Sequence, residues 1–181
     1  RLGPVDGNGI YGVPDQYIVM GDTAAVVLSP PPVVDVDSYL GTWYEVGSVK
    51  QFFSLGLVNT KAEYSLNADG SIKVVNSGNY FFNRGPKSTI NGAALPVDDT
   101  NAKLNVAFFG RQPSAAPPGN YWIVDLDPDY QWAVVGEPDR KYLWILSRSP
   151  EMPRTQFEQL KATATQMGYD LAPLIVAAPL R

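Results

Sequence analysis

The sequence predicts an all-β domain, an eight-stranded antiparallel up-and-down β-barrel with one C-terminal α-helix packed outside. Three observations lead to this fold class. Short runs of strand-forming residues recur between residues 43 and 147, with tight turns between them. Several late runs are apolar on both faces, which a sheet with one solvated face would not need. A single amphipathic helical pattern follows the last run.

The eight runs are joined by short connections, which indicates an antiparallel meander rather than parallel strands with long crossovers. In the second run, Ala62, Tyr64 and Leu66 alternate with polar residues, the period of two expected of a strand whose two faces differ. Eight strands are enough to close into a barrel. The predicted strands are residues 43–50, 60–66, 71–77, 87–94, 103–109, 120–126, 131–136 and 141–147.

The helix is predicted over residues 152–167. Phe157, Leu160, Ala164 and Met167 fall on one stripe at intervals of three and four residues. Gly168 is typical of the residue after a helix C-terminus. Because such a stripe most often serves packing, we expect this helix to cover the outside of the barrel.

Composition excludes several function classes. The 181 residues carry a formal net charge of −4, and no cluster of Lys and Arg is present, so we expect no nucleic-acid partner. The chain contains no His and no Cys. Imidazole or thiolate metal sites, His-ligated haem, His-based catalytic triads and disulfides are therefore excluded. We predict no metal and no cofactor.

Residues 1–34 form a Pro- and Gly-rich N-terminal extension, and residues 35–181 form the barrel domain with its helix. The extension is either a flexible tail or an arm that lies along or plugs the barrel. The first residue is Arg1 rather than Met, which fits a mature form without its signal peptide or a trimmed chain. We expect a secreted protein or one in the cell envelope, periplasmic or extracellular.

Three short motifs follow one another along the chain in an order that is typical of one protein family. Gly41 and Trp43 open the first strand, Pro128-Asp129-Tyr130 lies between strands six and seven, and Arg148 follows strand eight. This succession resembles the lipocalin family, specifically its bacterial lipocalin and apolipoprotein D branch. The second motif is usually Thr-Asp-Tyr, so Pro128 departs from it. The resemblance covers about residues 35–177 and implies that Gly41, Trp43, Asp129, Tyr130 and Arg148 are structural.

A physical reason for two of these residues can be given. The narrow end of an eight-stranded barrel must be sealed, and a large indole with a guanidinium stacked over it closes the floor, with a cation–π contribution of about 0.5–2 kcal/mol. Loss of Trp43 or Arg148 should therefore lower stability before it changes ligand specificity.

The resemblance implies binding and transport or storage of a small lipophilic ligand in the lumen, such as a fatty acid or a lysophospholipid. Strand parity is secure within each run, but a shift of one residue would reverse which side points inward. Phe52 and Phe53 belong to a loop expected to cover the open end. The residues expected to contact ligand are Glu45, Gly47, Phe52, Phe53, Tyr64, Phe108, Tyr121, Ile123, Trp132, Val134, Tyr142 and Trp144.

Two other function classes stay open. A lipocalin-like isomerase or cyclase would need a carboxylate or phenol with a shifted pKa, for example Glu45 beside a Tyr. A protein-interaction module would have a lumen filled by its own side chains. The consecutive aromatics Phe52 and Phe53 leave open a peripheral membrane contact or a homodimer.

Overall fold

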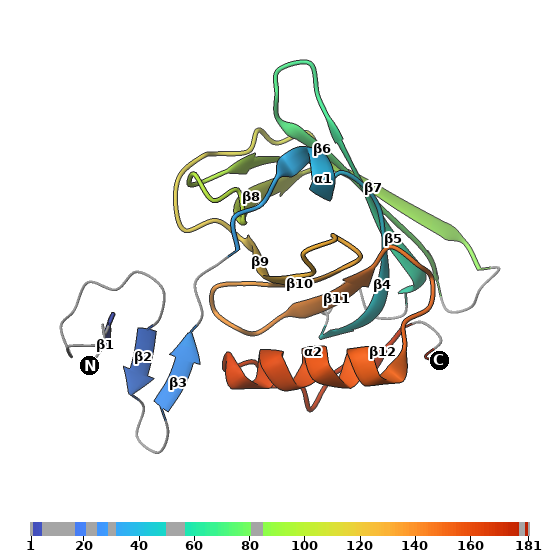
Figure 1. Cartoon of the computed structure of the whole chain (residues 1–181). Coiled ribbons are helices and arrows are strands. Elements are labelled where there is room, and N and C mark those ends of the chain that lie inside the picture. The colour runs from blue at the N-terminus through green and yellow to red at the C-terminus, as the bar shows by residue number, and fades with distance from the viewer. Residues whose placement is uncertain are drawn as a thin grey trace.

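The computed structural model describes residues 2–4, 17–20, 25–28, 32–49, 57–80, 85–177 and 180, with backbone only for residues 2–4, 17–20, 25–28 and 57–59. Figure 1 shows a barrel of strands with one long helix beneath it and a small separate sheet at the N-terminus. That small sheet pairs β1 (Leu2–Pro4), β2 (Tyr17–Met20) and β3 (Ala25–Leu28) in order.

The barrel is made by eight antiparallel strands that follow one another in chain order, and it closes by pairing β11 with β4. The predicted fold class is confirmed. Each predicted strand is present, with ends that differ by a few residues. The strands are β4 (Gly41–Val49), β5 (Leu57–Leu66), β6 (Ile72–Tyr80), β7 (Lys87–Pro96), β8 (Lys103–Phe108), β9 (Tyr121–Leu126), β10 (Trp132–Gly136) and β11 (Leu143–Ser147).

The two ends of the barrel differ. At the closed end, the short helix α1 (Val36–Tyr39) leads directly into β4, and β11 ends there. At the open end, β4 ends together with β8 and β10, because strands alternate in direction around the meander. Near that end β4 no longer pairs with β5, and the short strand β12 (Ile175–Val176) pairs with Ser48 and Gly47 instead.

The pairings of the described strands contain three register shifts, one of them in β5 between Val58 and Lys61. The other two reverse the facing of side chains that line or adjoin the lumen. In β4, Glu45 pairs with Leu146 but Gly47 pairs with Ile145, so Val46 is an extra residue. In β9, Ile123 pairs with Val135 and Asp125 with Val134, so Val124 is extra. Such bulges keep the ladder but move every later residue to the other face.

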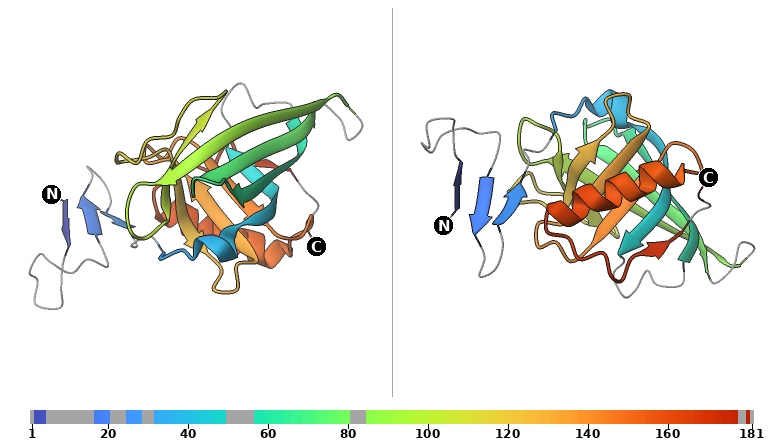
Figure 2. Two further views of the ribbon diagram at one scale, coloured as in Figure 1. Left: turned by 90° about the horizontal axis from the view of Figure 1, so that it is seen from above. Right: turned by 60° about the horizontal axis from the view of Figure 1, so that its bottom comes forward.

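The strands separate two apolar cores. One lies inside the barrel and contains Trp43, Ile123 and Val135, each at most 1% exposed. The other lies outside the wall and joins Val46 and Val134 to one face of α2 (Arg154–Gln166). Figure 2 shows this helix lying along the outside of the barrel.

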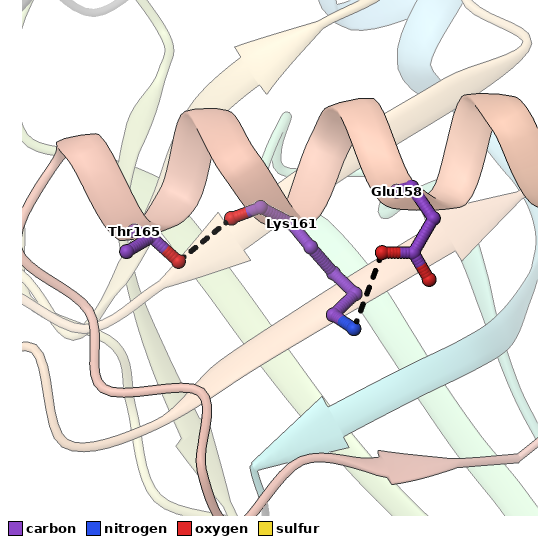
Figure 3. A network of polar contacts seen from close by, with 3 residues as sticks. All are labelled: Glu158, Lys161 and Thr165. Carbon is purple, nitrogen blue, oxygen red and sulfur yellow. Dashed lines mark hydrogen bonds and ion pairs between the residues drawn. The ribbon is translucent and has the colours of Figure 1, made fainter.

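The helix α2 is amphipathic, as predicted, and is slightly shorter than residues 152–167. Its buried residues are Phe157, Leu160 and Ala164, which face the barrel wall. On the solvent side, Lys161 lies 3.5 Å from Glu158, and the Thr165 hydroxyl donates to the Lys161 backbone oxygen (Figure 3). Within the described residues, neither helix is long and apolar enough to cross a membrane.

Candidate functional site

The lumen contains a cavity of about 410 Å³. At the open end its wall includes Phe109 and Glu137, the residues that follow β8 and β10. Toward the closed end it stops at Tyr64 and Tyr121. This volume falls in the range of about 300–1,000 Å³ seen for small-molecule sites. The lumen is therefore large enough for a ligand.

Five of the predicted site residues line this cavity together: Glu45, Tyr64, Phe108, Tyr121 and Trp144. They come from five different strands, so only closure of the barrel brings them together. Their contact with a ligand stays a prediction.

Gly47, Trp132 and Val134 were expected to face the lumen, and this expectation is wrong. Val134 is buried and Trp132 half-buried in the outer core beneath α2. A Cβ built on Gly47 would lie 2.9 Å from the Phe157 ring of that helix. The bulge at Val46 turns Gly47 to the outer face of β4. In β10 the residues that point inward are Ala133 and Val135, which alternate with the two that were expected to do so.

The remaining predicted site residues lie elsewhere. Ile123 is fully buried in the core inside the barrel, but the described wall of the cavity does not include it. Tyr142 is half-buried in the turn before β11 and is not among the described residues that line the cavity. Phe52 and Phe53 lie outside the described residues, so the lid expected there stays a prediction.

Several lining residues were not in the predicted set. Val135 and Leu146 both line the cavity. Val135 was missed because the wrong face of β10 was expected to point inward, and Leu146 was missed because only Trp144 was chosen on β11. Leu146 shares its parity with Trp144, so alternation within that strand was enough to find it. Asn120 also lines the cavity, with its side-chain amide bound to the backbone N–H and C=O of Val106. Alternation does not find this residue, because its neighbour Tyr121 also lines the cavity and a period of two would point only one of them inward.

Three tyrosine hydroxyls meet at the inner end of the cavity. The Tyr121 hydroxyl lies 2.6 Å from that of Tyr39 and 2.9 Å from that of Tyr64. Burial raises the pKa of Tyr64 to about 12. Burial, followed by the neighbouring tyrosines, raises the pKa of Tyr121 well above its ordinary value, and burial also raises that of Tyr39. All three are therefore neutral O–H groups near pH 7.

Below the tyrosines, Trp43 is wholly buried and forms the floor. The Arg148 guanidinium carbon lies 3.8 Å from the Trp43 ring centroid. Each of the three guanidinium nitrogens donates a hydrogen bond, to the backbone oxygens of Ser38, Thr42 and Tyr130. Burial lowers the pKa of Arg148 from its usual value, yet the group stays charged because that value is so high.

The other two motif residues adjoin this arrangement. Gly41 has φ +103°, and a Cβ there would lie 3.2 Å from Nη1 of Arg148. Asp129 is exposed in the turn that ends at Tyr130, whose hydroxyl accepts the Asp35 backbone N–H. The motif residues thus surround the closed end and not the cavity.

Polar groups on the cavity wall are few. Glu45 is 4% exposed and lies on the wall with Lys61. The Lys61 ammonium lies 4.0 Å from Glu63, which alternates with the inward Ala62 and Tyr64 and so faces outward. In the described part of the chain no group of acidic residues is arranged to hold a metal ion.

A second hollow of about 470 Å³ lies on the outer surface, between β4 to β7 and the C-terminal segment around Ala177. Most of the residues along it are polar, among them Ser77, Asn79 and Lys87, and it shares Glu45, Thr60 and Lys61 with the lumen cavity. Small-molecule sites are mostly apolar with a few placed polar groups. The lumen fits that description more closely, because aliphatic and aromatic side chains make up most of its wall.

Comparison with known proteins agrees with the geometry. Residues 34–179 match the model of the lipocalin-like domain family. The chain is 40% identical over 142 residues to the outer membrane lipoprotein Blc of Escherichia coli K12, covering 78% of this chain and 77% of that one. It is 39% identical to temperature-induced lipocalin-1 of Arabidopsis thaliana, with the same coverage. Identity to apolipoprotein D of Rattus norvegicus is 35%, over 80% and 78% of the two chains.

Solved structures agree on the fold alone. Apocrustacyanin A1 of lobster superposes with a TM-score of 0.58 at 18% identity, covering 78% of each chain. Insecticyanin of the tobacco hornworm Manduca sexta superposes with a TM-score of 0.57 at 19% identity, over 84% and 88% of the two chains. The resemblance inferred from the motifs is confirmed by the family match and by the relatives that are 35–40% identical. The chain belongs to the lipocalin family, whose members bind small hydrophobic ligands.

Proposed function

We propose that this protein binds a small lipophilic ligand, such as a fatty acid or a lysophospholipid, in the barrel lumen and transports or stores it. The single observation that supports this most is the cavity of about 410 Å³, whose wall is largely apolar. A lumen filled by its own side chains, as an interaction module requires, would leave no such volume.

The chemistry of the wall suits an acyl chain. Each methylene removed from water contributes about 0.8 kcal/mol, so a long chain offsets its ordering cost without a special recognition group. Phe108, Val106 and Trp144 supply the apolar surface. The open end, beside Glu137, is where a polar head group reaches solvent.

Titration with a fluorescent fatty-acid probe tests the proposal, after the purified protein has been stripped of co-purifying lipid. We expect saturable binding of one probe per chain and competitive displacement by unlabelled fatty acid or lysophospholipid. Mass spectrometry of the lipid extract should identify a stoichiometric lipophile. Absence of saturable binding and of any extracted lipophile would contradict the carrier function.

A pair of neighbouring substitutions locates the site. Val106 lines the cavity, whereas Ala107 follows it on the same strand and alternates to the other face. Val106→Phe should weaken probe binding by about tenfold or more, because the added ring occupies lumen volume. Ala107→Phe adds even more bulk, but on the outer face, and should leave affinity unchanged. Equal effects of the two variants would move the site away from the lumen.

We favour a carrier over an enzyme, because the family members compared above are known by names that describe lipocalins and lipoproteins rather than catalysts. An enzyme in this barrel would need a carboxylate or phenol with a shifted pKa, and the buried Glu45 is the example that the sequence offers. We expect the wild-type protein and Glu45→Gln both to bind lipophiles without releasing product. Turnover by the wild type that Glu45→Gln abolishes would support the enzyme instead.

We also propose a location in the cell envelope or outside the cell. Support comes from the Blc relatives, which are named outer membrane lipoproteins. Immunoblotting of fractionated cells of the source organism tests this. Detection in the cytoplasmic fraction alone would contradict it.

A further inference from the structure

The tyrosines at the inner end of the cavity form a chain of three hydroxyls. Tyr121 is in the middle, 2.6 Å from the Tyr39 oxygen and 2.9 Å from the Tyr64 oxygen. Tyr64 and Tyr121 line the cavity, and Tyr39 lies behind them, 5.1 Å from the Trp43 ring by centroids. No other hydrogen-bond partner of these three hydroxyls is found among the described residues.

A count of protons shows that the three hydroxyls cannot satisfy all of their hydrogen-bond donors among themselves. Three neutral hydroxyls bring three O–H donors, and two hydrogen bonds use two of them. If Tyr121 donates to one neighbour, that neighbour keeps its own O–H. If Tyr121 accepts from both, its own O–H is left. In every arrangement one donor remains, and a buried donor without an acceptor is costly.

We propose that the inner end of the lumen is a recognition subsite for a neutral oxygen, and that the preferred ligand carries a hydroxyl or a carbonyl on the end that enters first. This inference rests on the proposed function and narrows the ligand class. A ligand hydroxyl both accepts the remaining O–H and donates its own proton to a tyrosine lone pair. A terminal methyl does neither.

The surrounding charges select a neutral group over a carboxylate. Among the described residues lining the cavity, Lys61 is the cation, and its ammonium lies 4.0 Å from Glu63 on the outer face. The Arg148 guanidinium acts electrostatically on the Tyr39 hydroxyl, which lies behind the two cavity-lining tyrosines. Its three nitrogens already donate to the backbone oxygens of Ser38, Thr42 and Tyr130, and it does not line the cavity. A carboxylate at the tyrosines would lose its hydration without a cation beside it. The acid group of a fatty acid therefore stays at the open end.

Two ligands that differ in one group test the subsite. Dodecanoic acid ends in a methyl, and ω-hydroxydodecanoic acid ends in a hydroxyl. We expect the wild-type protein to bind the hydroxylated acid about tenfold more tightly, since a site with a buried donor discriminates against the analogue that lacks the acceptor. In a site without donors, burying the hydroxyl is a penalty and the order should reverse.

The same count of O–H donors predicts which ligand each tyrosine variant should prefer. The triple variant Tyr39→Phe, Tyr64→Phe, Tyr121→Phe has no donor left and should prefer dodecanoic acid. Tyr64→Phe alone leaves two hydroxyls and one hydrogen bond, so one donor remains and the preference for the hydroxylated acid should persist. Tyr44→Phe removes a hydroxyl that does not line the cavity and should behave as wild type.

The outcomes separate this inference from the proposed function. If both acids bind the wild type equally, or the methyl-ended acid binds better, the subsite is overturned while the carrier stands. If neither acid binds, both are overturned. If the triple variant fails to fold, the wild type and Tyr64→Phe still decide, because both must prefer the hydroxylated acid. A loss of that preference in Tyr64→Phe would contradict the proton count.

Discussion

The guanidinium carbon of Arg148 lies 3.8 Å from the centroid of the Trp43 ring, and the indole N–H donates across 2.9 Å to the Tyr39 backbone oxygen. Trp43 therefore contacts two separate elements: the residue after β11 stacks on its ring, and the last residue of α1 accepts its N–H. Arg148 also donates to Ser38, Thr42 and Tyr130. One side chain therefore ties three separate segments together at the floor of the lumen.

Arg148→Ala should lower the free energy of unfolding by about 2–4 kcal/mol, because three backbone oxygens lose a charged donor and the indole loses its cation. Urea denaturation followed by circular dichroism measures this. Arg154→Ala removes an exposed arginine from the first turn of α2 and should change stability by less than about 0.5 kcal/mol. The folded Arg148→Ala protein should bind the fatty-acid probe with unchanged affinity. A loss of affinity without a loss of stability would place Arg148 in the binding site.

Gly47→Ala should destabilise the protein by about 1–3 kcal/mol, because the new methyl would lie 2.9 Å from the Phe157 ring and the two must move apart. Thermal unfolding measures the change. The double variant Gly47→Ala, Phe157→Leu should show a positive coupling, since the smaller Leu makes room for the methyl. Additive losses would mean that Gly47 does not face the helix.

Replacing one tryptophan at a time should show by fluorescence on which side of the barrel wall the ligand binds. Trp144 lines the cavity, whereas Trp132 lies in the outer core under α2. Trp144→Phe should remove most of the quenching caused by a bound fatty-acid probe, and Trp132→Phe should retain it. The two variants make the same chemical change, so each serves as the control for the other. The reverse result would place the probe outside the barrel.

Stability should fall at alkaline pH because of the buried tyrosines. Tyr64 ionises near pH 10 when unfolded, but burial raises its pKa to about 12 in the folded protein. Between these values the folded state holds more protons than the unfolded state, so a rise in pH favours unfolding. The stabilisation is complete below about pH 10 and is lost as pH rises toward 12. The pKa values of Tyr39 and Tyr121 are raised by burial in the same direction.

Urea midpoints between neutral pH and pH 11 measure this effect. Each such tyrosine contributes a slope of about 1.4 kcal/mol per pH unit above its unfolded pKa. The triple variant Tyr39→Phe, Tyr64→Phe, Tyr121→Phe should have a much flatter profile in this range. A wild-type midpoint that stays constant up to pH 11 would show that these hydroxyls titrate as freely in the folded protein as in the unfolded one.

Much of the architecture could be predicted from local patterns. The alternation of Ala62, Tyr64 and Leu66 predicts a strand, and the stripe of Phe157, Leu160 and Ala164 predicts a helix, because each depends only on residues close in sequence. The motif around Trp43 resembled one family, and the family match confirmed it. These features are decided by short-range geometry and hold wherever the element lies.

The composition of the lumen wall was decided only by the tertiary structure. Glu45 points inward and Gly47 outward on one strand, because a single extra residue, Val46, is accommodated by the pairing with β11. In β10 both faces are apolar, since one meets the lumen and the other meets α2, and hydrophobicity alone cannot tell them apart. The hydroxyls of Tyr39, Tyr64 and Tyr121 lie far apart in sequence, and only closure of the barrel brings them within hydrogen-bonding distance. Sequence determines which residues alternate, and the folding of the whole sheet determines which side of that alternation meets a ligand.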